Sequence, residues 1–116
     1  MENPYLKMQV EVASPVERVV LLYDKAILLL KEALEALDEG DIPKKANAIA
    51  RADRIIRVLN SSLDMENGGE VAKVLRQFYD HLLDMLVVAN GKNDRELLST
   101  AIEMLETVKS AWEEIK

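Results

Sequence analysis

Apolar residues recur along this chain in steps of three and four, the spacing that places side chains on one face of an α-helix. The first stretch opens with Ser14-Pro15-Val16-Glu17, in which Ser14 can cap a helix, Pro15 suits its first position and Glu17 completes a capping box. Gly40 can end that helix. The pattern predicts a helix over residues 15–39, with an apolar stripe made of Val16, Val20, Tyr23, Ile27, Leu30, Leu34 and Leu37.

Three further stretches repeat the pattern. Asp41 can cap a second helix, which should end before the break at Asn67-Gly68-Gly69. A third helix is expected from about residue 70 to Asn90-Gly91, and a fourth should follow the capping box Asn93-Asp94-Arg95-Glu96. Their stripes are Ile42, Ala46, Ile49, Ile56, Leu59 and Leu63; then Val71, Leu75, Phe78, Leu82, Met85 and Ala89; then Leu97, Ala101, Met104, Val108, Ala111 and Ile115.

Helices of this length joined by short connections must run antiparallel to their neighbours in the sequence. The sequence therefore predicts an all-α protein, an antiparallel up-down-up-down four-helix bundle over residues 14–116, preceded by a short N-terminal arm over residues 1–13. The length of 116 residues fits a single domain.

Composition and charge argue against several classes of function. Asp and Glu outnumber Lys and Arg by 21 to 15, a formal charge of −6, which argues against a nucleic-acid partner. The absence of Cys excludes thiol chemistry, and one His cannot build a histidine-rich metal centre. No apolar run is long enough for membrane insertion, and the N-terminus lacks a signal-peptide pattern. We therefore expect a cytoplasmic protein that needs no metal or cofactor.

The predicted helices carry more apolar residues than one stripe each requires. One interpretation is a wide core, and the other is a groove that binds a partner helix or an extended apolar segment. The additional residues are Leu21, Leu22, Ala26, Leu28, Leu29, Ala33, Ala36, Ile55, Val58, Tyr79, Leu83, Leu86 and Val87.

Charge is distributed unevenly. Residues 42–60 contain five basic residues and one acidic residue, a net +4, so the rest of the chain carries −10. This window can be a solvated helix face that pairs with acidic neighbours, or it can guide an acidic partner segment.

His81 raises the alternative of a histidine phosphotransfer bundle. Such domains place Lys and Gly three and four residues after the histidine, whereas this chain has Asp84 and Met85, and a carboxylate there would repel the phosphoryl group. A di-iron bundle needs Glu-x-x-His twice, which one His forbids. The sequence contains no catalytic dyad and no glycine-rich phosphate-binding loop. We therefore expect that the protein is not an enzyme. A structural bundle that self-associates through its apolar stripes remains a further alternative.

An ordered set of short motifs resembles the FliS family of bacterial flagellin export chaperones. The motifs span nearly the whole chain, and they are Asn3-Pro4-Tyr5, Ala13-Ser14-Pro15, Leu21-Leu22-Tyr23-Asp24, Leu59-Asn60, Leu63-Asp64, Tyr79, Leu86, Ala89-Asn90, Asn93-Asp94 and Trp112. Asp24 and Pro4 depart from the family pattern, which often has a small residue and an alanine at those positions.

The resemblance implies a cytoplasmic chaperone that binds the disordered C-terminal segment of flagellin, prevents its premature polymerisation and assists its delivery to the flagellar type III export apparatus. It also implies components of the export gate as partners. The expected client-binding residues are Leu22, Tyr23, Ala26, Leu29, Ile55, Leu59, Leu63, Tyr79 and Leu86. The arm would act as a removable cap on this surface through Tyr5, Leu6 and Met8.

Overall fold

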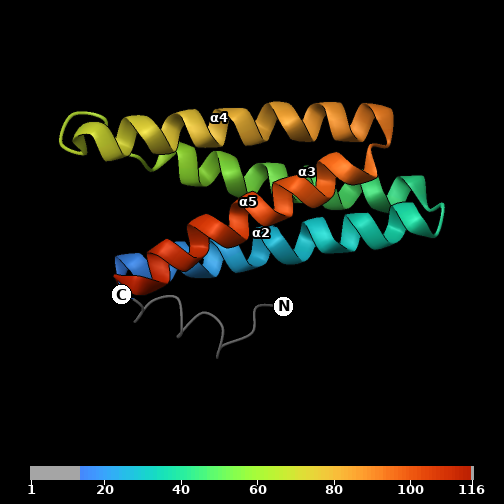
Figure 1. The fold of residues 1–116 in the computed structure, drawn as a ribbon, viewed down its shortest axis with the longest axis horizontal. Coiled ribbons are helices and arrows are strands. Elements are labelled where there is room, and N and C mark those ends of the chain that lie inside the picture. Colours follow the sequence, from blue (N-terminus) through green and yellow to red (C-terminus); the bar gives the residue numbers. More distant parts are fainter. Residues whose placement is uncertain (1–13, 116) are drawn as a thin grey trace, which may run out of the picture.

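The computed structural model describes residues 14–115, so the predicted arm over residues 1–13 lies outside the described residues. The described chain forms four α-helices and no strand (Figure 1). These helices are α2 (Pro15–Asp38), α3 (Ile42–Ser61), α4 (Gly69–Lys92) and α5 (Arg95–Glu114). The predicted all-α fold is confirmed, and the predicted helix ends agree within a few residues.

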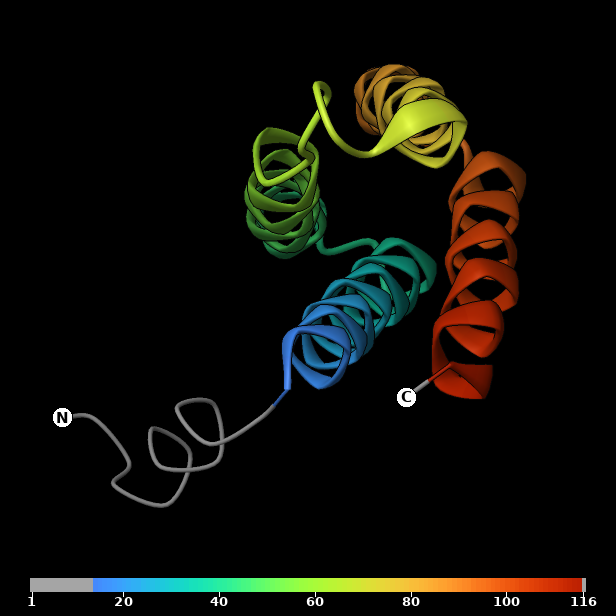
Figure 2. The same cartoon turned by 90° about the vertical axis from the view of Figure 1, so that its left-hand side faces the viewer.

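Successive helices run antiparallel and form a ring. α2 packs against α3 and α5, and α4 closes the ring by packing against the same two helices (Figures 1 and 2). The two short turns, α2–α3 and α4–α5, lie at one end of the bundle (Figure 1). The α3–α4 loop, the start of α2 and the end of α5 lie at the other end. The structure is therefore the up-down-up-down bundle that the sequence predicts.

Side-chain caps begin three of the helices. Ser14 Oγ accepts a hydrogen bond from the Glu17 N–H at 3.1 Å. Asp41 Oδ1 accepts one from the Lys44 N–H at 3.1 Å. Each cap satisfies a main-chain donor that the first turn of a helix leaves unpaired. Gly40 has a φ of 76°, the left-handed conformation that was expected to end the first helix.

The α4–α5 turn differs from the prediction. α4 does not stop at Gly91 but continues to Lys92, and Asn93 then adopts the left-handed conformation, with φ 52° and ψ 44°. Asparagine tolerates this conformation better than other residues with a side chain. The cap of α5 is consequently Asp94, which accepts the Leu97 N–H at 3.0 Å, and not Asn93.

The core contains most of the additional apolar residues of the first helix. Ala26, Leu29, Ala33 and Ala36 are buried beside the predicted stripe of α2, so the wide-core interpretation holds for them.

The predicted stripe of the fourth helix is correct in part: Ala101 is buried and Leu97, Met104 and Val108 pack against the core, but the most deeply buried positions are shifted by about one residue. Ile115 is exposed and Met104 is only half-buried, whereas the buried residues of α5 are Leu98, Ala101, Ile102 and Leu105. Leu97-Leu98 and Met104-Leu105 are adjacent apolar pairs, so the periodicity allows two faces, and packing against the neighbouring helices selects one. Elsewhere, Ile42 and Val71 were also expected inside and are exposed.

Lys45 joins α3 to the α4–α5 turn. Its side chain is 2% exposed, and Nζ donates to the Asn90 carbonyl at 2.8 Å, to Asn90 Oδ1 at 2.8 Å and to Asn93 Oδ1 at 2.6 Å. These three acceptors use all three ammonium hydrogens. The site also lies at the C-terminal end of α4, where the helix dipole favours a positive charge. Lys45 therefore fixes the position at which α4 ends and α5 begins.

We expect Lys45→Met to lower the free energy of unfolding by about 2–4 kcal/mol, because three oxygen acceptors lose their buried donor. Urea denaturation measures this. Lys44→Met is the matched control, since Lys44 is exposed, and it should change the stability by less than about 0.5 kcal/mol. Equal stability of the two variants would refute a structural role for Lys45.

Candidate functional site

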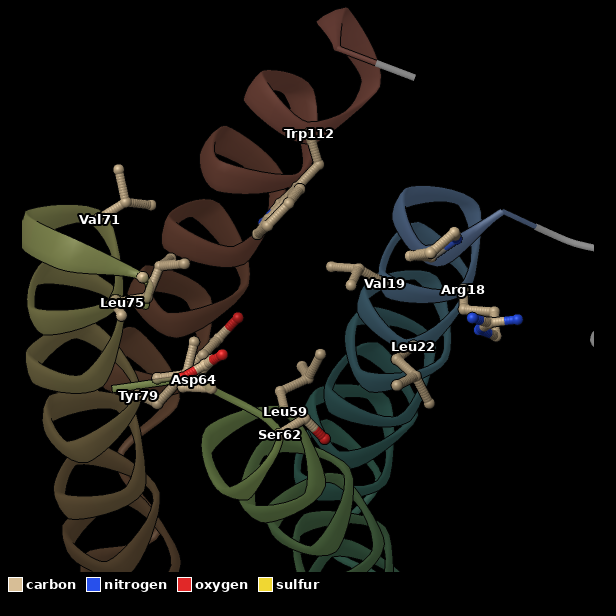
Figure 3. Close-up of a pocket in the computed structure, with 14 residues that line it drawn as sticks. Arg18, Val19, Leu22, Leu59, Ser62, Asp64, Val71, Leu75, Tyr79 and Trp112 are labelled. Carbon is tan, nitrogen blue, oxygen red and sulfur yellow. The ribbon is translucent and has the colours of Figure 1, made fainter. Parts of the chain in front are cut away.

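A cavity of about 480 Å³ opens at the end of the bundle opposite the two short turns. All four helices and the α3–α4 loop contribute to its mostly apolar wall, and Val19, Leu59 and Trp112 project into the space from three different helices (Figure 3). We call this cavity the end pocket. It is lined by Pro15, Arg18, Val19, Leu22, Leu59, Ser62, Leu63, Asp64, Gly68, Val71, Ala72, Leu75, Tyr79 and Trp112.

The end pocket exists because α4 and α5 diverge. The two helices meet at their connection, and from there α5 crosses toward the start of α2 while α4 keeps its own direction (Figures 1 and 2). The first turns of α4 are therefore separated from the last turns of α5. Side chains from both helices and from α2 face the gap, which is why Val19, Leu22 and Leu75 are only half-buried.

Two tyrosines pair at the base of the end pocket: Tyr79 lines it, and Tyr23 is fully buried and does not. The hydroxyl oxygens of Tyr23 and Tyr79 are 2.8 Å apart, and the two rings are tilted at 59° with centroids 6.3 Å apart. Burial raises the pKa of the Tyr23 hydroxyl, an effect opposed by its hydrogen bonds with Tyr79 and Trp112. Burial, followed by the hydrogen bond to Tyr23, also raises the pKa of Tyr79. Both hydroxyls therefore stay protonated and can donate hydrogen bonds.

The α3–α4 loop shapes the rim. Asp64 accepts hydrogen bonds from the Asn67 side-chain amide at 2.9 Å and from the main-chain N–H groups of Asn67 and Glu66 at 3.0 and 3.2 Å. Gly68 must be glycine here, because a Cβ atom would lie 2.5 Å from both the Ala72 Cβ and the Asp64 carbonyl oxygen. The predicted break at Asn67-Gly68-Gly69 thus forms one edge of the end pocket.

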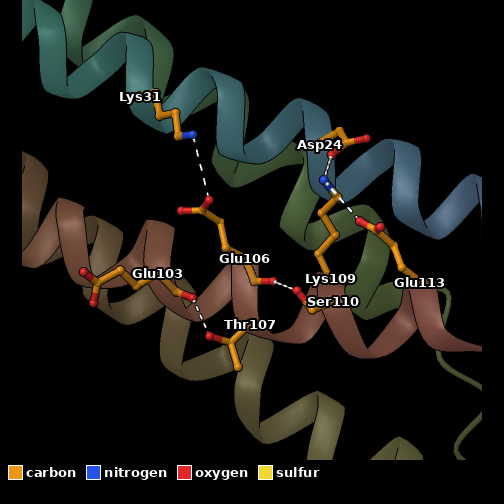
Figure 4. A network of polar contacts seen from close by, with 8 residues as sticks. All are labelled: Asp24, Lys31, Glu103, Glu106, Thr107, Lys109, Ser110 and Glu113. Carbon is orange, nitrogen blue, oxygen red and sulfur yellow. Dashed lines mark hydrogen bonds and ion pairs between the residues drawn. The ribbon is translucent and has the colours of Figure 1, made fainter.

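Ion pairs join α5 to α2 along a groove separate from the end pocket. Lys109 of α5 contacts Asp24 of α2 and Glu113 of its own helix, and Lys31 lies 3.9 Å from Glu106 (Figure 4). Asp38 pairs with Arg95 at the opposite end of the same helix pair, at 2.7 Å. Asp24, which departs from the FliS family pattern, therefore has an ion-pair partner in Lys109.

The predicted client-binding residues fall into two groups. Leu22, Leu59, Leu63 and Tyr79 line the end pocket. Tyr23, Ala26 and Leu29 are buried beneath it or along the core, Ile55 is half-buried, and Leu86 lines a separate groove between α3 and α4. The cap residues Tyr5, Leu6 and Met8 lie outside the described residues.

Sequence reasoning missed several residues of the end pocket. Val19 lies between the two apolar stripes of the first helix, and neither stripe includes it. Trp112 was noted only as part of the family motifs. Its position in the wall depends on how α5 crosses the bundle, which no local pattern encodes.

The remaining candidates lie elsewhere. His81 is exposed on α4 and does not line the end pocket. In the basic window, Lys45 is buried and Arg57 pairs with Asp53 at 2.6 Å, which leaves fewer charges for a partner. Residues 14–115 contain no group of three or more acidic, His or Cys side chains placed to hold a metal ion. Over the same range, no helix is both long and apolar enough to cross a membrane.

The fold has a solved counterpart. A structure described as a flagellar chaperone from bacteria superimposes with a TM-score of 0.82, covering 96% of this chain and 94% of that one at 11% identity. The bundle is thus the fold of a bacterial flagellar chaperone.

Sequence comparison defines the family. The family described as "Flagellar protein FliS" matches residues 1–116. The flagellar secretion chaperone FliS of Vibrio cholerae is 40% identical over 92% of this chain and 79% of that protein. FliS of Salmonella typhimurium is 35% identical over 89% and 77%, and FliSB of Pseudomonas aeruginosa is 36% identical over 95% and 87%.

The chain belongs to the FliS family of flagellar proteins. The predicted family and the predicted function as a flagellar export chaperone are confirmed. The phosphotransfer alternative at His81 is not favoured.

The stability of the rim should depend on pH through Asp64. Hydrogen bonds from the Asn67 side chain and main chain lower the pKa of Asp64 below its ordinary value of 3.8. The folded state therefore favours the charged carboxylate. Its stabilising contribution is complete above the unfolded pKa and is lost as the pH falls through the folded pKa.

Asp64→Asn should consequently flatten the loss of stability between about pH 5 and pH 2. Urea midpoints recorded across this range for both proteins measure the difference, and near neutral pH the variant should be the less stable. Parallel pH profiles would contradict the role of the carboxylate.

Proposed function

We propose that the end pocket binds the C-terminal segment of flagellin, so that the chaperone keeps this segment from polymerising and assists its delivery to the export apparatus. The supporting observation is an apolar cavity lined by all four helices, in a chain of the FliS family. We further propose that the protein acts in the cytoplasm and meets components of the export gate there.

Binding a disordered segment requires apolar contact, because the client loses conformational freedom when it is ordered. Leu22, Leu63 and Leu75 line the end pocket but are only half-buried by the bundle itself. Completing the burial of such side chains contributes up to about 1.5–3 kcal/mol each. The end pocket therefore offers apolar surface that the fold has not already used.

Contacts beyond the end pocket would lengthen the client site. Val71 and Val74 on α4 are 67% and 60% exposed, and Val71 lies at the rim. The groove between α3 and α4 adds Leu86 and Val87, with Arg54 beside them. An extended client could follow these surfaces, with the basic residues of α3 as an electrostatic guide.

The N-terminal arm is proposed as a removable cap on the end pocket. Residues 1–13 join the described chain at Ser14, and the next residue, Pro15, lines the end pocket, so the arm is attached at its rim. The arm contains Tyr5, Leu6 and Met8, which could fill an apolar site. Ordering the arm costs conformational entropy, so a client with more apolar surface could displace it.

Leu22→Asp tests the end pocket. Isothermal titration calorimetry with a synthetic C-terminal peptide of the cognate flagellin should show at least a tenfold loss of affinity, about 1.4 kcal/mol, because an apolar wall gains a charge. Leu28→Asp is the matched control on the same helix, since Leu28 is 59% exposed and lies outside the end pocket. Circular dichroism checks that both variants are folded.

The control should bind within about threefold of the parent. For the parent protein, raising salt from about 0.1 to 1 M should weaken binding only modestly, because screening affects charge and not apolar burial. The heat-capacity change of binding should be strongly negative. Similar affinities for Leu22→Asp and Leu28→Asp would reject the end pocket as the client site.

Deleting residues 1–10 tests the cap. The bundle should remain folded, a hydrophobic dye should bind more strongly, and the flagellin peptide should bind faster, because no arm competes for the end pocket. Stopped-flow mixing measures the association rate, and sedimentation velocity reports whether the uncovered surface instead promotes self-association. If neither dye binding nor peptide binding changes, the arm is not a cap.

A further inference from the structure

The groove between α3 and α4 is separate from the end pocket. It has a volume of about 350 Å³ and shares no lining residue with the end pocket. Val87 lines this groove and is 66% exposed, so the fold leaves an apolar side chain in water there. We call the cavity the α3–α4 groove, and its wall includes Ile49, Ala50 and Arg54 of α3 with Leu86, Val87 and Asn90 of α4.

Positive charge without a partner lies on the α3 side of this groove. Asp53 also lines the groove, but its carboxylate pairs with Arg57 at 2.6 Å. Arg54 lines the groove, and Arg51 lies one helical turn before it. Both arginines are exposed, and within residues 14–115 the side chain of neither forms an ion pair or a hydrogen bond, not even with the exposed Asp84 of α4. A free guanidinium group can bind a carboxylate through two parallel hydrogen bonds.

The α3–α4 groove lies within reach of a chain that occupies the end pocket. On α3, Leu59 lines the end pocket and Arg54 lines the groove, a separation of about 8 Å along the helix axis. On α4, the corresponding residues Tyr79 and Leu86 are about 10 Å apart along the axis. Val58, which is 50% exposed, lies on α3 between the two sites. About three residues of extended chain span such a distance.

We propose that the client segment continues from the end pocket into the α3–α4 groove and places an acidic side chain against Arg54 and Arg51. The proposal rests on the end pocket as the client site. Residues 42–60 carry +4 while the rest of the chain carries −10, so an acidic side chain is attracted to α3 in preference to the other helices.

This contact adds charge and register to a selection that the end pocket makes by apolar content alone. The acidic residue should lie about three to seven positions from the apolar residues that fill the end pocket, for an extended or a helical connection. An apolar neighbour of that residue would cover Val87.

Arg54→Glu tests the contact by titration calorimetry with the flagellin C-terminal peptide. At about 0.1 M salt, binding should be about fivefold weaker, because the acidic side chain then meets a like charge. Lys25→Glu is the control of equal charge change, since Lys25 is exposed on α2 and lines neither the end pocket nor the groove. Its affinity should stay within about twofold of the parent, because salt screens charges separated by more than ~10 Å. At about 1 M salt the affinity of Arg54→Glu should approach that of the parent, which a damaged fold would not do.

A double-mutant cycle identifies the group that the arginines bind. One arm is a protein carrying both Arg51→Ala and Arg54→Ala, and the other is a peptide in which Asp and Glu are replaced by Asn and Gln. Each change alone should weaken binding about threefold, and both together should weaken it no further, because they remove the same contact. Losses that simply multiply, or a peptide whose affinity does not depend on its acidic residues, would overturn the proposal.

Two adjacent valines test the apolar part of the α3–α4 groove. Val87 lines the groove, whereas Val88, which is 42% exposed, does not. Val87→Asp should weaken peptide binding about fivefold, because a charge replaces apolar contact, and Val88→Asp should bind like the parent. Equal affinities for Val87→Asp and Val88→Asp, or for Arg54→Glu and Lys25→Glu, would show that the client does not enter the groove. If Leu22→Asp weakens binding and Arg54→Glu does not, only this inference fails; if Leu22→Asp has no effect, the proposed function fails and this inference fails with it.

Discussion

The two-residue connection between α4 and α5 is the constraint on which this architecture depends. Only Asn93 and Asp94 separate the two helices. Lys45, near the start of α3, donates three hydrogen bonds to Asn90 and Asn93 and so fixes the turn. The helices are therefore forced together at that end. Because α5 then lies across α2, the gap between α4 and α5 widens toward the other end, where the end pocket forms. The closed end of the bundle determines the shape of the open end.

The buried residues of α5 follow this difference between the closed and the open end of the bundle. The buried residues of α5, Leu98, Ala101, Ile102 and Leu105, all lie at or before the middle of the helix, and none lies in its last nine residues. Its second half is held by half-buried Val108 and Trp112 and by ion pairs such as Lys109 with Asp24. Exposed ion pairs contribute little to stability. Apolar surface near the end pocket thus remains available, while the closed end supplies much of the packing that maintains the fold.

Local chemistry in the sequence predicted the helices well. Ser14 and Asp41 cap helices as expected, and Gly40 has the positive φ that a helix end requires. The face of α5 could not be predicted, because Leu97-Leu98 and Met104-Leu105 allow two registers of equal periodicity. Gly91 did not end α4. A glycine can stay within a helix when a later residue, here Asn93, adopts the left-handed conformation that ends it.

The candidate site was only partly predictable for a related reason. Leu22, Leu59, Leu63 and Tyr79 were identified from apolar surplus and family motifs, and they do line the end pocket. The same surplus also included Ala26 and Leu29, which are core residues. A sequence pattern reports that a side chain is apolar but not whether another helix covers it. The divergence of α4 and α5 decides that, and it arises from packing over the whole bundle.

The chain has a single tryptophan, and its position at the end pocket makes it an intrinsic optical reporter. The emission of an indole depends on the polarity around its ring and on nearby groups that quench it. Trp112 is half-buried on α5 and faces the cavity, so the tryptophan emission of this protein originates at the end pocket. Occupancy of the cavity can consequently be followed in the unmodified protein, with no label attached to either partner.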